Sequence, residues 1–274
     1  MEVPMNISIP TSTAILMVTL ALMNTVIPII IAYHYKKRFD VKISTFFIGL
    51  FTYVAFAMLL VQIPDILIRG SIKPFANLVK DNALVGALYF PIITVLMEEF
   101  GRLFTFKFMM KNRMNKNEAL MMGVGHGGIQ SMLTGSSVMM SNAILAFAIN
   151  SFGAEEYVTK LGLKGEELET TRKGLIEFGQ IPVMQHFFDG SIPILIMIGQ
   201  VALSFIVFVA ISDQRKKFLF PVAMLMHFVL LLPLYLVRKE VFTNMFVAET
   251  LMLIVLVAIV YFAYQMYHGI AKNA

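Results

Sequence analysis

Seven long apolar runs constrain this chain more than any other feature of its sequence. Each is at least as long as the roughly 20 residues that an α-helix needs to cross a bilayer, and the fourth and fifth exceed a simple span. Of all residues, 58% are hydrophobic and only 14% are charged, which leaves no stretch that reads as a soluble domain. The sequence therefore predicts an all-α, polytopic membrane protein of seven transmembrane helices, with residues 1–274 forming one integral-membrane domain. The runs lie near residues 12–34, 44–68, 83–110, 118–150, 179–211, 217–237 and 241–268.

Basic residues at the ends of these runs predict the orientation. Twelve Lys and Arg fall on the side of the C-terminus, including Lys36 to Arg38 and Arg215 to Lys217, against nine on the other side. Because cytoplasmic loops carry the excess of Lys and Arg, we expect the N-terminus outside and the C-terminus in the cytoplasm. The acidic segment 153–178 is then an extramembrane loop, whose stretch EELETTRKGLIEFG has helical spacing. The expected location is a bacterial plasma membrane.

The net charge of +5 arises from these loop residues, which suit anionic lipid headgroups, so we expect a lipid bilayer and no nucleic acid as the partner. The chain has no cysteine, and any bound metal would need His, Asp or Glu as ligands.

Three charged residues interrupt the third apolar run, in the stretch LMEEFGRLF. These are Glu98, Glu99 and Arg102. A charge at mid-bilayer costs about 2.5 to 3.5 kcal/mol on insertion scales, so three together need a reason. At spacings of four and three residues, Arg102 can pair with either glutamate on its own helix, which leaves one carboxylate over. The cluster indicates either an ion-pair triad that fixes helix packing or part of a functional site.

Three histidines lie inside other apolar runs, namely His126, His186 and His227. Histidine is the commonest metal ligand and a general base of suitable pKa. Counting residues from the run ends places the two glutamates and His227 near the bilayer midplane, a level that His186 fits least well. Since lipid exposure of any of these groups would be costly, we expect Glu98 or Glu99, His126 and His227 to face one interior cavity.

Two polar stripes accompany these histidines. Their spacing predicts that each occupies one face of a helix and lines a polar interior. Glycines around the first histidine, in the stretch GVGHGG, allow another helix to approach closely or the helix to break. The first stripe is His126, Gln130, Thr134, Ser137 and Ser141, and the second is His186, Asp189, Gln200 and Ser204.

These motifs resemble the YhfC family of intramembrane metalloproteases, itself distantly similar to the APH-1 subunit of gamma-secretase and to the CAAX-protease and bacteriocin-processing group. The resemblance rests on EEFGR from Glu98 to Arg102, on GVGHGG around His126, and on the later histidines His186 and His227. It covers about residues 90–235. Gln130 stands where the family pattern usually has glutamate, and Leu231 stands where an acidic or amide residue often follows the last histidine.

The resemblance implies hydrolysis of a membrane-embedded or lipid-linked peptide by an activated water. Glu98, Glu99, Arg102, His126 and His227 are then the catalytic candidates, and His126, His186 and His227 could hold Zn²⁺ while one glutamate acts as base and the other pairs with Arg102. A metal-free alternative has Glu and His polarise the water directly. The soluble zinc-protease motif HExxH is absent from the sequence.

Two other classes of function remain open on sequence grounds. A non-catalytic scaffold, as the resemblance to APH-1 implies, would use the same polar residues for helix packing and partner binding. A small transporter would use them as a proton relay, but the chain shows no inverted halves or paired broken helices, which gives this class little support.

Overall fold

The computed structural model describes residues 5 and 7–272 and, within them, contains helices and no strands. Seven helical stretches are long and apolar enough to cross a membrane, which confirms the predicted count. The predicted limits of the seven runs agree with these stretches to within a few residues. The stretches are Thr11–Phe39, Ile43–Ser71, Ala83–Met109, Lys116–Phe152, Val183–Ser212, Leu219–Arg238 and Met245–Gly269.

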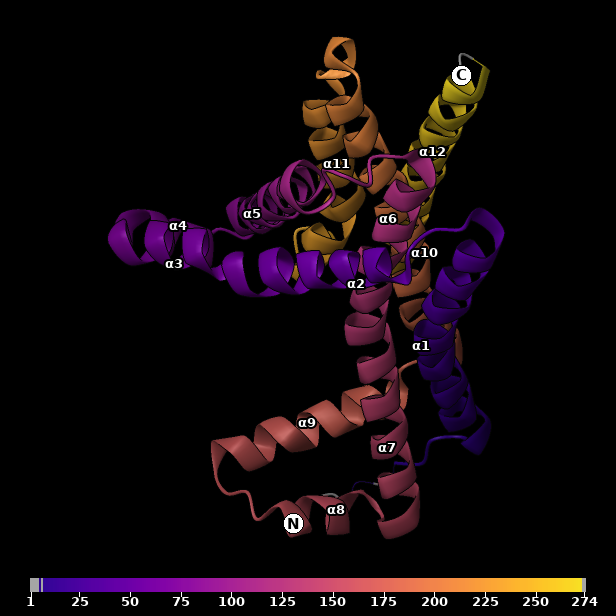
Figure 1. Ribbon diagram of the computed structural model, residues 1–274. Coiled ribbons are helices and arrows are strands. Elements are labelled where there is room, and N and C mark those ends of the chain that lie inside the picture. Colours follow the sequence, from indigo (N-terminus) through magenta and orange to yellow (C-terminus); the bar gives the residue numbers. More distant parts are fainter. Residues whose placement is uncertain (1–4, 6, 273–274) are drawn as a thin grey trace. The chain divides into compact units, whose positions relative to one another are not determined.

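Figure 1 shows these helices along the chain. In order they are α1 (Thr11–Phe39), α2 (Ile43–Thr52), α3 (Gln62–Ser71), α4 (Lys73–Asp81), α5 (Ala83–Phe104), α6 (Lys116–Ser131), α7 (Ser137–Phe152), α8 (Ala154–Leu161), α9 (Glu166–Gln180), α10 (Val183–Ser212), α11 (Leu219–Arg238) and α12 (Met245–Lys272). The π-helical segments η1 (Tyr53–Leu60) and η3 (Met132–Ser136) interrupt the second and fourth spans, and the π-helical segment η2 (Thr105–Met109) ends the third span. A short 3₁₀ turn, η4 (Gln214–Lys216), precedes α11.

Short polar residues and glycines set several helix ends. The Asn82 side chain accepts a hydrogen bond from the Val85 backbone N–H at 3.0 Å and caps α5, and Asn115 caps α6 in the same way through the Glu118 N–H at 2.9 Å. At the other end, α7 stops at Gly153, whose φ of 81° is a left-handed conformation that glycine adopts without strain.

Contacts within the chain divide it into two units. The first comprises residues 1–27 and 131–194, and the second comprises residues 28–130 and 195–274. This division does not test the prediction that residues 1–274 form one integral-membrane domain.

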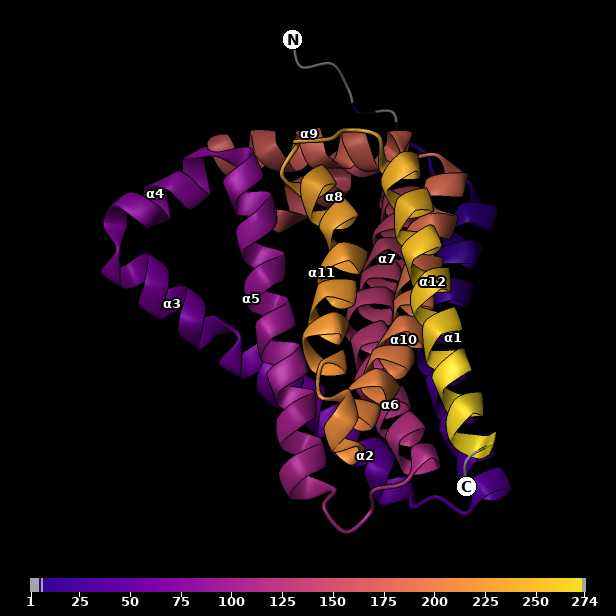
Figure 2. The ribbon, with the colours of Figure 1, turned by 90° about the horizontal axis from the view of Figure 1, so that it is seen from above.

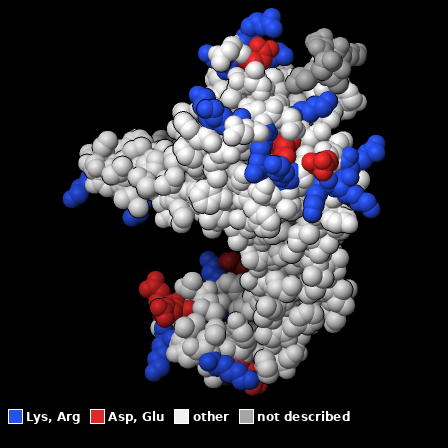
Figure 3. Space-filling model, viewed as in Figure 1, with Lys and Arg blue, Asp and Glu red and all other residues white. Residues whose placement is uncertain are grey.

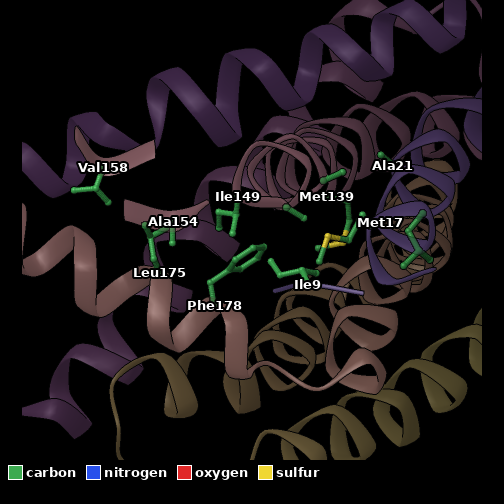
Figure 4. Packing of buried hydrophobic residues seen from close by; sticks show 13 residues of the cluster. Ile9, Met17, Ala21, Met139, Ile149, Ala154, Val158, Leu175 and Phe178 are labelled. Carbon is green, nitrogen blue, oxygen red and sulfur yellow. The ribbon is translucent and has the colours of Figure 1, made fainter. Parts of the chain in front are cut away.

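The first unit has an apolar core under the acidic segment. Met17 of α1, Met139 and Ile149 of α7, and Phe178 of α9 pack together in this core (Figure 4). The segment 153–178 forms α8 and most of α9, so the predicted helical character of EELETTRKGLIEFG is confirmed. Its location outside the membrane stays a prediction.

The second unit contains the polar cluster that the sequence singled out. Within it α11 packs against both α5 and α12, and Figure 2 shows these three helices side by side. The helix α2 crosses α6, and the two approach through glycine: a methyl group added at Gly125 would overlap the Phe46 carbonyl oxygen, and one at Gly49 would overlap the Met122 carbonyl oxygen. Close backbone contact of this kind is how helices pack in a bilayer, where van der Waals contact drives association.

Candidate functional site

The helix α5 places Glu98, Glu99 and Arg102 inside the second unit. All three side chains are buried, and Arg102 has no exposed surface. Its Nη1 donates a short hydrogen bond to Glu99 Oε1, and its Nη2 lies 3.5 Å from Glu98 Oε2. Glu99 is therefore the closer ionic partner of Arg102, although the helix spacing allows either glutamate.

His126 reaches the first glutamate from α6. Its Nε2 lies 3.1 Å from Glu98 Oε2, and because a carboxylate only accepts, the imidazole must donate from this nitrogen. The flanking glycines explain how the ring gets there. A Cβ at Gly123 would come within 2.8 Å of the Val201 Cα, and one at Gly127 within 2.9 Å of the Met197 carbonyl oxygen. The sequence GVGHGG thus lets α6 lie against α10 on one side and α2 on the other.

His227 reaches the second glutamate from α11. Its Nδ1 donates to Glu99 Oε1 at 2.7 Å, and its Nε2 lies 3.9 Å from Glu98 Oε2. Each glutamate consequently has its own histidine, and Arg102 contacts both carboxylates. In the neutral imidazole this arrangement leaves His227 Nε2 as an acceptor.

Two residues of α10 complete the cluster. The Gln200 side-chain amide donates to Glu98 Oε2 at 3.1 Å and to Gln130 Oε1 at 2.8 Å, while its oxygen accepts from Arg102 Nη2. Ser204 Oγ accepts from Arg102 Nε at 3.2 Å. Both residues belong to the second predicted stripe, but no sequence feature distinguished them from its other members as site residues.

Tyr53 is a neighbour that the sequence did not indicate. It lies on η1, and its ring meets the His126 imidazole edge-on, with centroids 5.3 Å apart. Three residues further along η1, Phe56 packs against the backbone at Gly101, where an added methyl group would come within 2.6 Å of the Phe56 ring. The π-helix η1 therefore covers the cluster, and π-helical turns occur frequently at functional sites.

Two buried polar atoms of the cluster make no hydrogen bond to any described residue: Glu99 Oε2 and His126 Nδ1. Both are acceptors in the protonation states assigned above. Each can accept a hydrogen bond from a water or a substrate group.

Two of the predicted metal ligands, His126 and His227, hydrogen-bond to the glutamates in this structure. Within residues 5 and 7–272, no group of three His, Asp or Glu side chains has the geometry to hold one ion. His126 and His227 instead use one nitrogen each on a carboxylate, and the cation that both carboxylates face is the Arg102 guanidinium.

The third predicted ligand, His186, belongs to the first unit. Its ring packs edge-on against Phe178 of α9, with centroids 5.8 Å apart. The side chain is 2% exposed, and its Nδ1 has no hydrogen-bond partner among the residues described. A metal-binding role for His186 alongside His126 and His227 stays a prediction.

The first polar stripe is wrong beyond Gln130. Thr134, Ser137 and Ser141 are exposed, and η3 breaks the constant α-helical period on which the stripe was based. The buried polar groups of this stretch are different ones. Ser131 Oγ donates to Asn24 Oδ1 at 2.6 Å, and the Asn24 amide donates to the Gly190 carbonyl oxygen at 2.7 Å, all within the first unit.

The fold and the cluster together define a multi-pass membrane protein with a buried Glu–His–Arg site. A family model described as YhfC intramembrane metalloprotease matches residues 23–252, a range that includes every candidate site residue, and the chain belongs to this family. The uncharacterized membrane protein YhfC of Bacillus subtilis (strain 168) is 26% identical over 242 residues, which cover 86% of this chain and 89% of the relative. No solved structure matches the chain.

Proposed function

We propose that this protein is an intramembrane peptidase that hydrolyses a membrane-embedded or lipid-linked peptide. One observation carries the proposal: Glu98, Glu99, Arg102, His126 and His227 meet in one buried network built from α5, α6 and α11. Burying this many ionisable groups costs folding free energy even when they pair with one another. Ionisable residues inside membrane proteins therefore often mark functional sites. Membership of a family described as intramembrane metalloproteases supports the functional reading.

We assign the base to Glu98 and the structural partner of Arg102 to Glu99. Glu98 Oε2 lies 3.1 Å from His126 Nε2 and makes the longer contact with Arg102, at 3.5 Å. Glu99 makes the shorter contact with Arg102 and also hydrogen-bonds to His227. Glu98 would take a proton from the attacking water and pass it to the leaving amine, as general acid–base catalysis requires. Gln200 would position Glu98 through its amide N–H, and Gln130 supplies the acceptor oxygen that orients Gln200 in turn.

Access to the cluster requires movement of the helices that cover it. Glu98 is 2% exposed and the His126 and His227 side chains are fully buried, so neither water nor a peptide reaches them in this conformation. The covering element is η1, through Tyr53 and Phe56. We expect η1 to open when a substrate binds, as lids and loops do in many enzymes.

A Zn²⁺ ion would add a Lewis acid to this site, and two imidazoles with two carboxylates are donors of the kind that zinc takes. As arranged, however, these donors hydrogen-bond to one another and to Arg102, and they do not fit a metal site. We therefore assign no step to a metal. Because the family is described as metalloproteases, the metal requirement of hydrolysis is measured directly by chelation.

The test is hydrolysis by the purified chain in lipid vesicles, with a library of membrane-embedded peptides as substrates. Glu98→Gln should abolish cleavage while the protein remains folded, and Glu177→Gln on the exposed face of α9 is the matched control. Cleavage that survives in folded Glu98→Gln at the unmodified rate would disprove the assignment. Dialysis against a chelator, followed by Zn²⁺ addition, measures the metal requirement in the same assay.

A non-catalytic scaffold is the second candidate, and the complete burial of the cluster favours it. In that case the network would fix α5, α6, α10 and α11 against one another and present the outer helix surfaces to a partner. Glu98→Gln and Glu99→Gln would then change stability or partner binding together, with no separate loss of hydrolysis.

The protein is a multi-pass membrane protein, and we propose that it resides in a bacterial plasma membrane with its N-terminus outside. The description of the Bacillus subtilis relative as a membrane protein supports the membrane location, and the excess of Lys and Arg on the side of the C-terminus supports the orientation.

A further inference from the structure

An apolar groove lies in the second unit, away from the Glu–His–Arg cluster. It is formed by α1, α6, α10 and α12 and has a volume of about 420 Å³, within the range of about 300 to 1,000 Å³ that small-molecule sites occupy. Its wall is aliphatic and aromatic, with Leu120, Val260 and Phe205 among the lining residues and with Tyr35, Tyr264 and Tyr267 as the tyrosines.

The groove is open on the outer surface of these helices. Phe39 is 38% exposed and Tyr264 is 57% exposed, and both line it. Tyrosines are enriched where a membrane protein meets the headgroup region, because the ring is apolar and the hydroxyl is polar. An apolar groove bordered by tyrosines suits a chain that runs from the headgroup level into the bilayer.

Basic residues lie close to the tyrosines that border the groove. The Lys116 Nζ lies 4.5 Å from the centre of the Tyr267 ring, and Lys36, Lys37 and Arg38 are exposed in the helical turn between Tyr35 and Phe39. In Figure 3 blue side chains, with a few red ones among them, gather where α1 ends and α6 begins, whereas the neighbouring surface of the spans is white. An occupant of this groove should therefore combine an apolar chain with a negative charge at one end.

We infer that this groove binds an anionic phospholipid, with an acyl chain between α1, α6, α10 and α12 and the phosphate beside Lys116 and the basic turn at Lys36 to Arg38. Charge complementarity selects this occupant, because each Lys or Arg near a membrane surface adds attraction for an anionic headgroup. A neutral phospholipid has the same chains but lacks the net charge. The inference does not depend on peptide hydrolysis.

Phosphatidylglycerol and phosphatidylcholine with identical chains are the probes. The full-length protein, stripped of lipid in detergent, is titrated with each, and bound lipid is counted by native mass spectrometry. We expect phosphatidylglycerol to bind at least tenfold more tightly and to raise the melting temperature more. Equal affinity for the two lipids would overturn the inference.

Two variants locate the site. Val260→Phe fills the groove and should prevent tight lipid binding, whereas Val257→Phe, 60% exposed on the same helix and not part of the groove, is the matched control. Lys116→Gln should weaken phosphatidylglycerol binding about fivefold without changing phosphatidylcholine binding, and Lys173→Gln on α9 should change neither.

If Val260→Phe does not fold, the comparison of Lys116→Gln with Lys173→Gln still tests the proposed lipid site. Unchanged phosphatidylglycerol binding in Lys116→Gln, or a protein dimer that Val260→Phe dissociates while lipid binding persists, would place the lipid elsewhere and refute the proposed site.

Discussion

Replacing the two glutamates of α5 one at a time should have unequal effects on stability. Arg102 is fully buried, and its short contact with Glu99 is its main ionic interaction. Glu99→Gln leaves the guanidinium with Glu98 Oε2 at 3.5 Å and two neutral acceptors, Gln200 and Ser204. Breaking a buried ion pair in this way costs about 3 to 5 kcal/mol.

Glu98→Gln leaves the Arg102–Glu99 pair intact. Its main loss is the charge on the hydrogen bonds from His126 and Gln200, a cost of about 1 to 3 kcal/mol. The two variants should therefore differ by about 2 kcal/mol, or roughly 30-fold in the folding equilibrium. The free energies of unfolding are measured in detergent by titration with sodium dodecyl sulfate.

A double variant provides the control for this difference. Glu99→Gln combined with Arg102→Met removes both buried charges, and it should recover much of the stability that Glu99→Gln alone loses. A Glu98→Gln protein that is less stable than Glu99→Gln would refute the assignment of Glu99 as the Arg102 partner. So would a double variant no more stable than Glu99→Gln.

Three further predictions concern packing, orientation and the role of α10. Gly125→Ala should destabilise the protein by about 1 to 3 kcal/mol in the same titration, because its methyl group would overlap the Phe46 carbonyl oxygen, while Gly174→Ala, where nothing lies within 4 Å, should not destabilise. A cysteine placed at Arg38 should resist a membrane-impermeant thiol reagent in intact cells, and labelling from outside would reverse the predicted orientation. Gln200→Leu should lower kcat at least tenfold with little change in KM, and an unchanged kcat would exclude its positioning role.

Much of the fold follows from the sequence because bilayer spans need continuous apolar runs, and the limits of the seven runs agree with the helices to within a few residues. The meeting of Glu98, Glu99, Arg102, His126 and His227 was also predictable in outline, since lipid exposure of these groups would be costly. Which histidine contacts which glutamate was not, because that depends on how α6 and α11 pack around α5.

The errors have a local cause. The stripe from His126 to Ser141 assumes a constant α-helical period, but η3 changes the period at Met132. The helix propensities of the residues do not predict a π-helical turn. Tyr53 escaped notice for a similar reason: it is one apolar residue among many in its span, and only the fold brings it to His126.

Hydrolysis of a peptide bond within the bilayer, dependent on Glu98, is the central claim. Its most direct measurement is cleavage of a membrane-embedded peptide by the reconstituted protein in ¹⁸O-labelled water, with the products read by mass spectrometry. We predict one ¹⁸O atom in the new carboxyl terminus with the unmodified chain, and at least a hundredfold less product with folded Glu98→Gln. Absence of cleavage by the folded, unmodified chain across the library, or equal labelled product from both proteins, would contradict the claim.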